Sequence, residues 1–335
     1  MPEISRILCA VDVSDASRRV LDCALVWARQ HGADVSVLHV RLLTPPAAEA
    51  ARVAEDMAAP TPPAVMVEPP LTPTERNTRL LELETFVHER RTDGLQVEVL
   101  LDEDASLAGA ILSRADALAA DLIVMGAGTD PMSEHPVLSR VTTEVLRTAP
   151  CSVLVVPSPA PDVANPYASG LNRIMCAVSF SEGSVHALAC ATSLAKQTAA
   201  RLAVVHVVEL FSEVAALAYD FDAHREARLQ PACDELVDLV AAVVGHDTPV
   251  EEIVAQGTPS NEILKLADEE SSGLIVVGHA RAPKAGGKHP AGQEVAREAH
   301  CPVLFVHAEP ALLSLQRDPA LGTDAAADAA KGAKA

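Results

Sequence analysis

The sequence predicts an α/β protein with two tandem, doubly wound domains, each built on a five-stranded parallel sheet. The first observation is a repeat: RILCAVDVSD at Arg6 returns as RIMCAVSFSE at Arg173, and DLIVMG at Asp121 returns as GLIVVG at Gly273. The second is that short β-rich runs alternate with longer helical stretches in both copies. The third is that LIVM and LIVV have few polar interruptions, which is typical of central strands covered on both faces.

Both copies contain the same order of elements. The strands expected in the first copy are Arg6–Val11, Asp34–Val40, Gln96–Leu101, Leu122–Gly126 and Ser152–Val156. Those expected in the second are Arg173–Val178, Arg201–Val208, Val250–Ala255, Leu274–Gly278 and Pro302–His307. Amphipathic patterns predict helices at Ser14–His31, Glu75–Arg91, Ser106–Ala120, Ser181–Ala199, His224–Val244 and Ser260–Ser271. Ligands bind outside the carboxyl ends of such strands, so the residues after each strand are the candidates for a site.

The repeat also sets the domain boundaries, which we expect at residues 1–158 and 168–309, followed by a tail at 310–335 that frays. Matching residues are 167 apart at Arg6 and Arg173 but 152 apart at Asp121 and Gly273, so the first copy carries 15 extra residues. They fall in a stretch rich in Pro and Ala, residues 44–74, whose eight prolines exclude a continuous helix or central strand. We expect an exposed insertion there. A loop without a role is the simpler interpretation, although long loops can act as lids.

Composition excludes several classes of protein. A chain of 335 residues with 49% hydrophobic residues has material for two cores. A formal net charge of −20 and only 2% aromatic residues disfavour nucleic acid as a partner. No apolar run approaches the roughly 20 residues of a membrane helix, and the start lacks the pattern of a signal peptide. The expected location is therefore the cytoplasm, without contact with a membrane.

The cysteines favour neither metal nor redox chemistry. Six of the seven match between the copies: Cys9 with Cys176, Cys23 with Cys190, and Cys151 with Cys301. Each lies on an apolar element, where a free cysteine behaves as a small hydrophobic residue. The seventh, Cys233, is expected to be buried on a helix, with a reactive thiol as the alternative. Neither CxxC nor HExxH occurs, so no metal site is expected.

The conserved runs of the two copies resemble the universal stress protein family. They are AVDVSDAS, VSVLHV, DLIVMGAG and EVLRTAPCSVLVV in the first copy, and AVSFSEGS, LAVVHV, GTPSNEIL, GLIVVGHA and EVAREAHCPVLFV in the second. The resemblance implies the strand order 3-2-1-4-5 and an adenine nucleotide α-hydrolase-like fold. It also implies dimers joined through the last strands, so the two copies are expected to pair with each other, with further pairing between chains in a homodimer.

Members of this family that bind ATP have an Asp at the end of the first strand. Asp12 takes that position here, and Val40 takes the adenine-side position after the second strand. Capping of the helix that follows Asp12 is the alternative role for its side chain. Met125 precedes Gly126, which matches the first glycine of a pattern Gly-x-x-Gly, nine residues, Gly-Ser/Thr. Glycines of this kind let backbone N–H groups at a helix N-terminus hold phosphates.

The rest of that glycine pattern is altered in the first copy. Thr129 takes the second glycine position, with Gly128 one residue early, and Ser139 and Arg140 replace the Gly-Ser pair. Ser139 is suited to cap the last helix, and Arg140 to donate to a phosphate. A surface arginine without a ligand is an equally good interpretation of Arg140.

The second copy has lost more of the pattern. Ser179 replaces the aspartate, and Gly278 is followed by Arg281 at the next glycine position. Arg281, Lys284 and Lys288 form a basic loop that could attract an anion at Gly278, for which a solvated loop is the alternative. ATP or another adenine nucleotide, if one is bound, is therefore expected in the first copy.

Three functions remain open from the sequence. The first is a non-enzymatic stress-response module that binds an adenine nucleotide weakly through its first domain. The second is a dimeric scaffold or regulator without a nucleotide, and the third is a nucleotide hydrolase. Matching positions supply no nucleophile, base and orienting group together, so the protein is expected not to be an enzyme and to have no catalytic residues. His39 and His206 occupy equivalent positions, which favours a structural role for both.

Overall fold

The computed structural model places ten strands and eight helices of the chain among the residues it describes. These residues are 4–43, 70–90, 92, 94–128, 138–157, 171–209, 221–245, 248–278 and 291–307, without the side chains of 221–228. The first copy contains β1 (Arg6–Ala10), α1 (Asp15–His31), β2 (Asp34–Leu42), α3 (Pro73–His88), β3 (Val97–Asp104), α4 (Leu107–Ala117), β4 (Leu122–Gly126), α5 (Arg140–Thr148) and β5 (Ser152–Val156). The second contains β6 (Arg173–Val178), α6 (Glu182–Thr198), β7 (Arg201–Glu209), α7 (Phe221–Val243), β8 (Val250–Gly257), α8 (Pro259–Glu269), β9 (Leu274–Gly278), α9 (Ala291–Glu298) and β10 (Val303–Val306).

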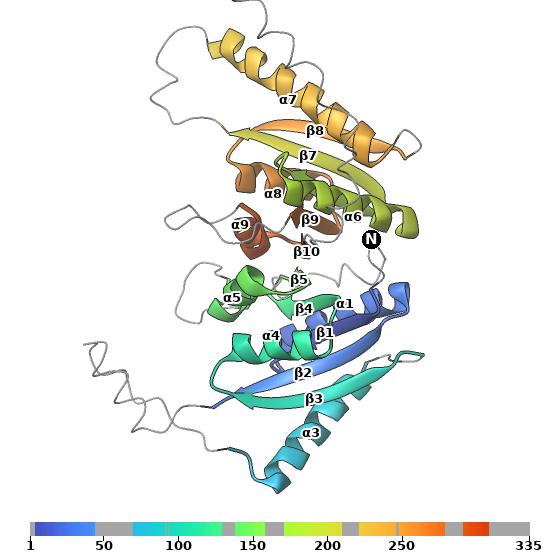
Figure 1. Cartoon of the computed structure of the whole chain (residues 1–335), viewed down its shortest axis with the longest axis vertical. Helices are drawn as coiled ribbons and strands as arrows, with labels where there is room; N and C mark the ends of the chain where they lie inside the picture. The colour runs from blue at the N-terminus through green and yellow to red at the C-terminus, as the bar shows by residue number, and fades with distance from the viewer. Residues whose placement is uncertain are drawn as a thin grey trace, which may run out of the picture.

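The strands of both copies form one ten-stranded sheet in the order β3-β2-β1-β4-β5-β10-β9-β6-β7-β8. Each half has the expected order 3-2-1-4-5, and its strands are parallel. The halves meet where β5 and β10 pair antiparallel, with Leu154 opposite Leu304. Figure 1 shows β3 and β8 at the two ends of the sheet. The expected pairing of the two copies through their last strands is thus present within one chain.

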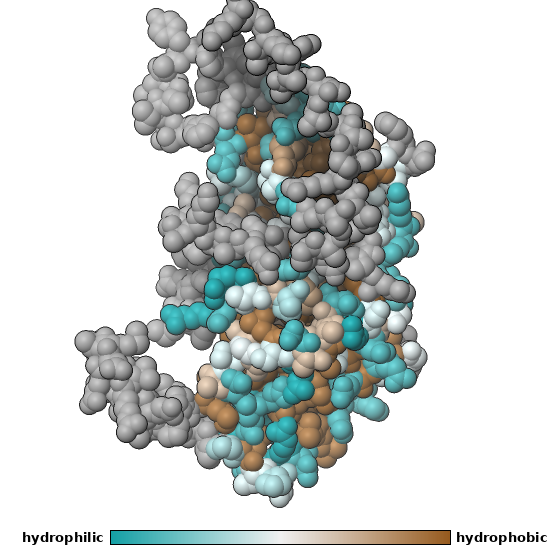
Figure 2. All heavy atoms as spheres, in the orientation of Figure 1, coloured by the Kyte–Doolittle hydropathy of each residue, from teal (hydrophilic) through white to brown (hydrophobic). Residues whose placement is uncertain are grey.

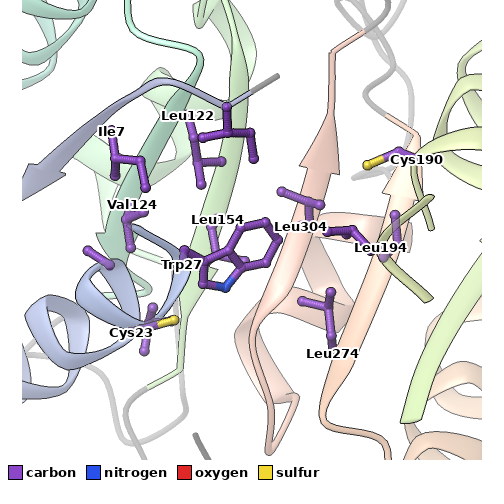
Figure 3. Close-up of a cluster of buried hydrophobic side chains, with 14 of the residues drawn as sticks. Ile7, Cys23, Trp27, Leu122, Val124, Leu154, Cys190, Leu194, Leu274 and Leu304 are labelled. Atoms are coloured by element: carbon purple, nitrogen blue, oxygen red, sulfur yellow. The ribbon is translucent and has the colours of Figure 1, made fainter. Parts of the chain in front are cut away.

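Two buried layers hold the helices against the sheet. The helices α1, α3, α6 and α7 pack on one face, and α4, α5, α8 and α9 on the other. At the junction of the copies, Figure 3 shows Trp27 of α1 beside Leu154 and Leu304. Trp27 is 3% exposed, and its counterpart in the second copy is the fully buried Leu194. Each layer therefore runs across the β5–β10 junction.

The outer surface mixes polar and apolar side chains. Figure 2 shows both kinds interspersed over the described part of the first copy. The large hydrophobic side chains exposed among the described residues lie in different places: Val13 in the turn after β1, Leu42 on β2, Leu81 on α3 and Val237 on α7. Within the described part of the chain, every helix falls short of the combined length and apolar character that a membrane crossing demands.

The proline-rich insertion, expected to end at residue 74, ends before Pro73 in the structure. The helix α3 already begins at Pro73, because proline suits the first helical position and Thr72 forms a capping box with Glu75. Residues 44–69 lie outside the described residues. Both of their flanks are fixed to the end of β3: Leu43 N–H donates to Asp104 O at 2.7 Å, and Leu71 N–H donates to Glu103 Oε1 at 2.9 Å.

The two strand-four glycines, Gly126 and Gly278, have different surroundings. A Cβ on Gly278 would lie 2.5 Å from the carbonyl carbon and oxygen of Gly183 and 2.7 Å from Ser184 N, in the first turn of α6. A Cβ on Gly126 would have Val20 Cγ2 as its nearest contact, at 3.5 Å. The first turn of the helix therefore packs directly on the strand end in the second copy, whereas the first copy leaves room there.

This difference makes Gly278→Ala and Gly126→Ala a matched pair for a stability test. We expect Gly278→Ala to lower the free energy of unfolding by about 2–3 kcal/mol, because the added methyl group meets backbone that cannot rotate away. Gly126→Ala is expected to change it by less than about 1 kcal/mol. Urea unfolding monitored by Trp27 fluorescence and circular dichroism measures both changes. Equal losses in the two variants would contradict the packing difference.

Candidate functional site

The first copy gathers the sequence-predicted residues at the carboxyl ends of β1, β2 and β4. Ala10 pairs with Leu38 and Cys9 with Val124, so the segments that follow these three strands emerge side by side. Asp12 lies two residues beyond Ala10, Val40 two beyond Leu38, and Gly126 two beyond Val124. This edge is where ligands bind in open α/β sheets.

Asp12 is an exposed carboxylate that its neighbours hold in a fixed orientation. Its Oδ1 accepts hydrogen bonds from Ser14 N at 3.0 Å, from Ser14 Oγ at 2.5 Å and from Ser17 Oγ. Ser17 Oγ in turn accepts from Asp12 N at 2.9 Å. The N-cap of α1 is Ser14, whose side chain accepts from Ser17 N. Asp12 therefore braces the turn before the helix without being the cap itself, and all three bonds use only one of its carboxylate oxygens.

The pKa of Asp12 reflects the balance of two effects. Partial burial of the carboxylate raises its pKa, but the hydrogen bonds from Ser14 and Ser17 outweigh that and hold the pKa below its ordinary value. The side chain is consequently a stable anion at neutral pH. Ser17 was not singled out from the sequence. The available signal was its match with Ser184, a polar residue kept in both copies on a helix face that is otherwise apolar.

The turn after the first strand is strained in the same way in both copies. Val13 has φ +64° and its counterpart Phe180 has φ +55°. Positive φ is unfavourable for a residue with a Cβ, and more so for a β-branched one such as Val13. The surrounding contacts must therefore impose this backbone conformation on the residues that follow Asp12 and Ser179.

On the other side of the site, Gly128 and Ser139 come together although eleven positions separate them. Gly128 has φ +74°, and a Cβ there would lie 2.5 Å from Ser139 Cβ. Ser139 N donates to Ala127 O at 3.0 Å, and Ser139 is the N-cap of α5, accepting from Thr142 N at 3.0 Å. Both the conformation and the close approach require glycine at 128. The expected capping role of Ser139 is confirmed.

Thr142 joins these two segments, and sequence reasoning missed it. Its side chain is 1% exposed, and its hydroxyl donates to Gly126 O at 3.0 Å and reaches Ala127 O at 3.3 Å. The signal that could have found it is the comparison of the copies: at the offset of 150 that matches the last helices, Thr142 corresponds to Gly292.

The remaining candidates of the first copy differ in exposure. Met125 is 5% exposed and belongs to the core beneath α4 and α5, as does the partly buried Val40 at its margin. Arg140 is exposed at the first position of α5 and has no hydrogen-bond or ion-pair partner among the described residues. It stands at the N-terminus of that helix, where the backbone N–H groups give a positive potential.

The histidines tie the first and second strands together in both copies. His39 Nδ1 lies 2.9 Å from Val11 O, and His206 Nδ1 lies 2.9 Å from Val178 O, so Nδ1 carries the hydrogen in each. In the second copy the ring of His206 also packs against Phe180, with 4.2 Å between the ring centres. The contacts agree with the structural role expected from their equivalent positions.

The second copy keeps this scaffold but not the Asp12 carboxylate or the Thr142 hydroxyl. Ser179 Oγ lies 3.1 Å from Ser181 Oγ, in place of the carboxylate contacts of Asp12. Gly278 faces the backbone of α6, as described above. Arg281, Lys284 and Lys288 lie outside the described residues. The described part of the second copy therefore offers no counterpart to the anchored Asp12.

A separate hollow of about 580 Å³ lies beside the carboxyl end of β3, lined by residues of β3, α3 and α4. Four of its charged side chains form two pairs: Arg114 Nε donates to Asp102 Oδ2 at 2.9 Å, and Arg76 Nη1 lies 3.6 Å from Glu103 Oε2. A third carboxylate, Asp104, accepts from Ser106 N. The hollow shares no lining residue with the Asp12 and Gly128 site. Because the acidic side chains of its lining outnumber the basic ones, this hollow is a poor place for the phosphates of a nucleotide.

Metal and thiol chemistry find no support among the described residues. In that part of the chain no three His, Cys, Asp or Glu side chains are grouped to hold a metal ion. Burial raises the pKa of Cys151, Cys190 and Cys301 to about 12, which keeps these thiols protonated and unreactive. Cys233, which we expected to be buried on its helix, is only partly so.

Comparisons with known proteins agree with this fold. The family model described as "Universal stress protein family" matches residues 3–157 and 170–307. A universal stress protein from Archaeoglobus fulgidus DSM 4304 is similar over 92% of this chain and 98% of its own, with 19% identity and a TM-score of 0.61. A putative universal stress protein from Pseudomonas aeruginosa UCBPP-PA14 covers 90% and 93%, with 17% identity and a TM-score of 0.56.

Other comparisons contribute less. A universal stress protein solved in complex with cAMP covers only 42% of this chain, with a TM-score of 0.34, and so carries no conclusion about a ligand here. No curated protein matches the sequence. Both of the full-length structures described above share an adenine nucleotide α-hydrolase-like fold with this chain. Since the family model covers most of both halves, the chain belongs to the universal stress protein family, with two of its domains in tandem.

Proposed function

We propose that this protein is a stress-response module that binds an adenine nucleotide, such as ATP or ADP, through its first domain. The observation that carries the proposal is the assembly of Asp12, Gly128 and Ser139 beyond the carboxyl ends of β1 and β4. Partly buried hydrogen bonds fix Asp12 and Ser139, and Gly128 packs against Ser139. The described part of the second copy has no equivalent set. The proposed site therefore lies in the first domain.

Each residue of the site has a defined role in the proposal. Asp12 Oδ1 is held by serines, which leaves Oδ2 to accept hydrogen bonds from ribose hydroxyl groups. The N-terminus of α5 and the Arg140 guanidinium supply positive potential for phosphates. Val40 and the hydrophobic margin of the α4 and α5 core offer an apolar contact for the adenine ring.

The proposal is for binding without hydrolysis. Hydrolysis needs a base that activates water, and Asp12 is a poor one because its lowered pKa makes it a weak proton acceptor. Location in the cytoplasm and assembly into a homodimer stay predictions from the sequence. For assembly, the β5 and β10 edges are already paired within the chain, so a homodimer would have to use other surfaces.

The first test replaces Asp12 by the residue of the second copy. We expect Asp12→Ser to weaken ADP binding about tenfold or more in titration calorimetry, since a hydrogen bond to a charged group contributes about 1.5–3 kcal/mol. Asp15→Ser is the matched control, because it removes the same charge from an exposed position three residues away. A wild-type protein that binds neither ATP nor ADP at millimolar concentration would refute the proposal.

A second test uses the pH dependence of stability. A carboxyl group with a lowered pKa stabilises the folded state above its ordinary pKa of about 3.9 and loses that contribution as the pH falls through the folded value. Asp12→Asn keeps the acceptor oxygen but not the charge. We expect the wild type to be more stable than Asp12→Asn in urea at pH 7, and the difference to shrink below about pH 4. A difference that stays constant down to pH 3 is the contrary result.

A further inference from the structure

We infer that Ser17 is a positioning residue of the candidate site, which holds the Asp12 carboxylate for the ribose hydroxyl groups and so makes the site select ribonucleotides. The inference rests on the proposed function, because it deepens the role given there to Asp12. Ser17 is 5% exposed, and its effect on a ligand passes through the exposed carboxylate of Asp12.

Ser17 bonds to both the main chain and the side chain of Asp12. Its hydroxyl accepts from Asp12 N at 2.9 Å and donates its single hydrogen to Asp12 Oδ1. The two contacts close a ring that restricts rotation of the Asp12 side chain. Ser17 lies on the buried side of α1, which also carries Val20 and Leu21. The carboxylate is therefore tied to a part of the helix that packs in the core.

The other serine that holds Asp12 gives a weaker support. Ser14 Oγ also donates to Asp12 Oδ1, at 2.5 Å, but Ser14 is exposed. A hydrogen bond is electrostatically stronger in the protein interior than in contact with water. The bond from the buried Ser17 is therefore expected to contribute more to the orientation of the carboxylate than the bond from Ser14.

Ser17 also holds the main chain where the sheet no longer does. Val11 N still donates to Leu38 O, at 2.9 Å, as a continuation of the β1–β2 pairing. The next N–H group, that of Asp12, donates to Ser17 instead. The residue after it, Val13, has the positive φ of +64° described above. Ser17 thus bonds to Asp12 at the point where the chain leaves the strand and turns into α1.

The second copy has the same serine without the carboxylate. Ser184 corresponds to Ser17 at the offset of 167 and is 3% exposed. With Ser179 in place of Asp12, the Ser184 hydroxyl donates to Ser181 O at 2.8 Å, at the start of its own helix. A buried serine at this position therefore contributes to the helix start, and the first copy uses it in addition to hold an acid. Ser184 is for this reason the matched control.

The experiment compares ADP with 2′,3′-dideoxy-ADP, which keeps the base and the phosphates but lacks both ribose hydroxyl groups. We expect the wild type to bind ADP more tightly. Ser17→Ala should weaken ADP binding about fivefold, since one hydrogen bond is lost, and binding of the dideoxy compound by less than about twofold. Ser184→Ala should leave both affinities within about twofold of wild type. Ser17→Cys, a weaker donor of similar size, serves if the alanine variant does not fold.

A ligand-free measurement separates failure of this inference from failure of the proposed function. Because the Ser17 hydrogen bond lowers the pKa of Asp12, a ¹³C titration of the Asp12 carboxyl group should show a higher pKa in Ser17→Ala but not in Ser184→Ala. If the wild type binds neither compound, the nucleotide proposal fails, and the titration decides whether Ser17 holds Asp12. An unchanged Asp12 pKa in Ser17→Ala, or equal losses of affinity for the two compounds, would overturn the inference. So would a wild type that binds both compounds equally well.

Discussion

The antiparallel pairing of β5 with β10 is the contact on which the rest of the molecule depends. It joins two five-stranded sheets into one and places Leu154 opposite Leu304, with Val153 opposite Phe305 and Val155 opposite Val303. All six side chains are at most 5% exposed, and burying a side chain of this size contributes about 1.5–3 kcal/mol. Without its partner, each half would present an apolar strand edge to water, which favours aggregation. The tandem arrangement covers that edge within a single chain.

Because the two halves share a scaffold, equivalent positions of their strand ends can be compared directly. Both keep the strained turn after the first strand and the histidine that ties this turn to the second strand. They differ at two positions near the carboxyl ends of the strands. The hydrogen-bonded carboxylate of Asp12 is replaced by Ser179, and the Thr142 hydroxyl, which bonds to Gly126 O, is replaced by Gly292. In the second half, the first turn of α6 also packs directly on Gly278. The same fold thus supports an open, polar strand end in one half and a closed one in the other.

Much of the fold could be predicted because its signals are local. Apolar runs such as LIVM and LIVV mark central strands, and the match between the copies fixes their order along the chain. Helix starts were predicted less well where proline is involved: Pro73 was assigned to the insertion but opens α3, since the capping box of Thr72 and Glu75 extends the helix to it. Of the site, Asp12, Gly128 and Ser139 were identified by their match to the pattern of the ATP-binding members of the family. Ser17 and Thr142 were missed because a buried hydroxyl on a helix leaves no pattern in a single copy.

The sequence by itself determined the duplication and the asymmetry between Asp12 and Ser179, because both are carried by residue types at fixed spacing. Its motifs pointed to the family, and that resemblance implied the strand order within each half. Only the tertiary structure decided that Thr142 holds the carbonyls of Gly126 and Ala127, that Gly128 packs on Ser139 and that Gly278 packs on Gly183. Those contacts join segments far apart in the chain. They depend on how closely a helix approaches a strand, within a few tenths of an ångström, and that distance is set by the packing of both cores together.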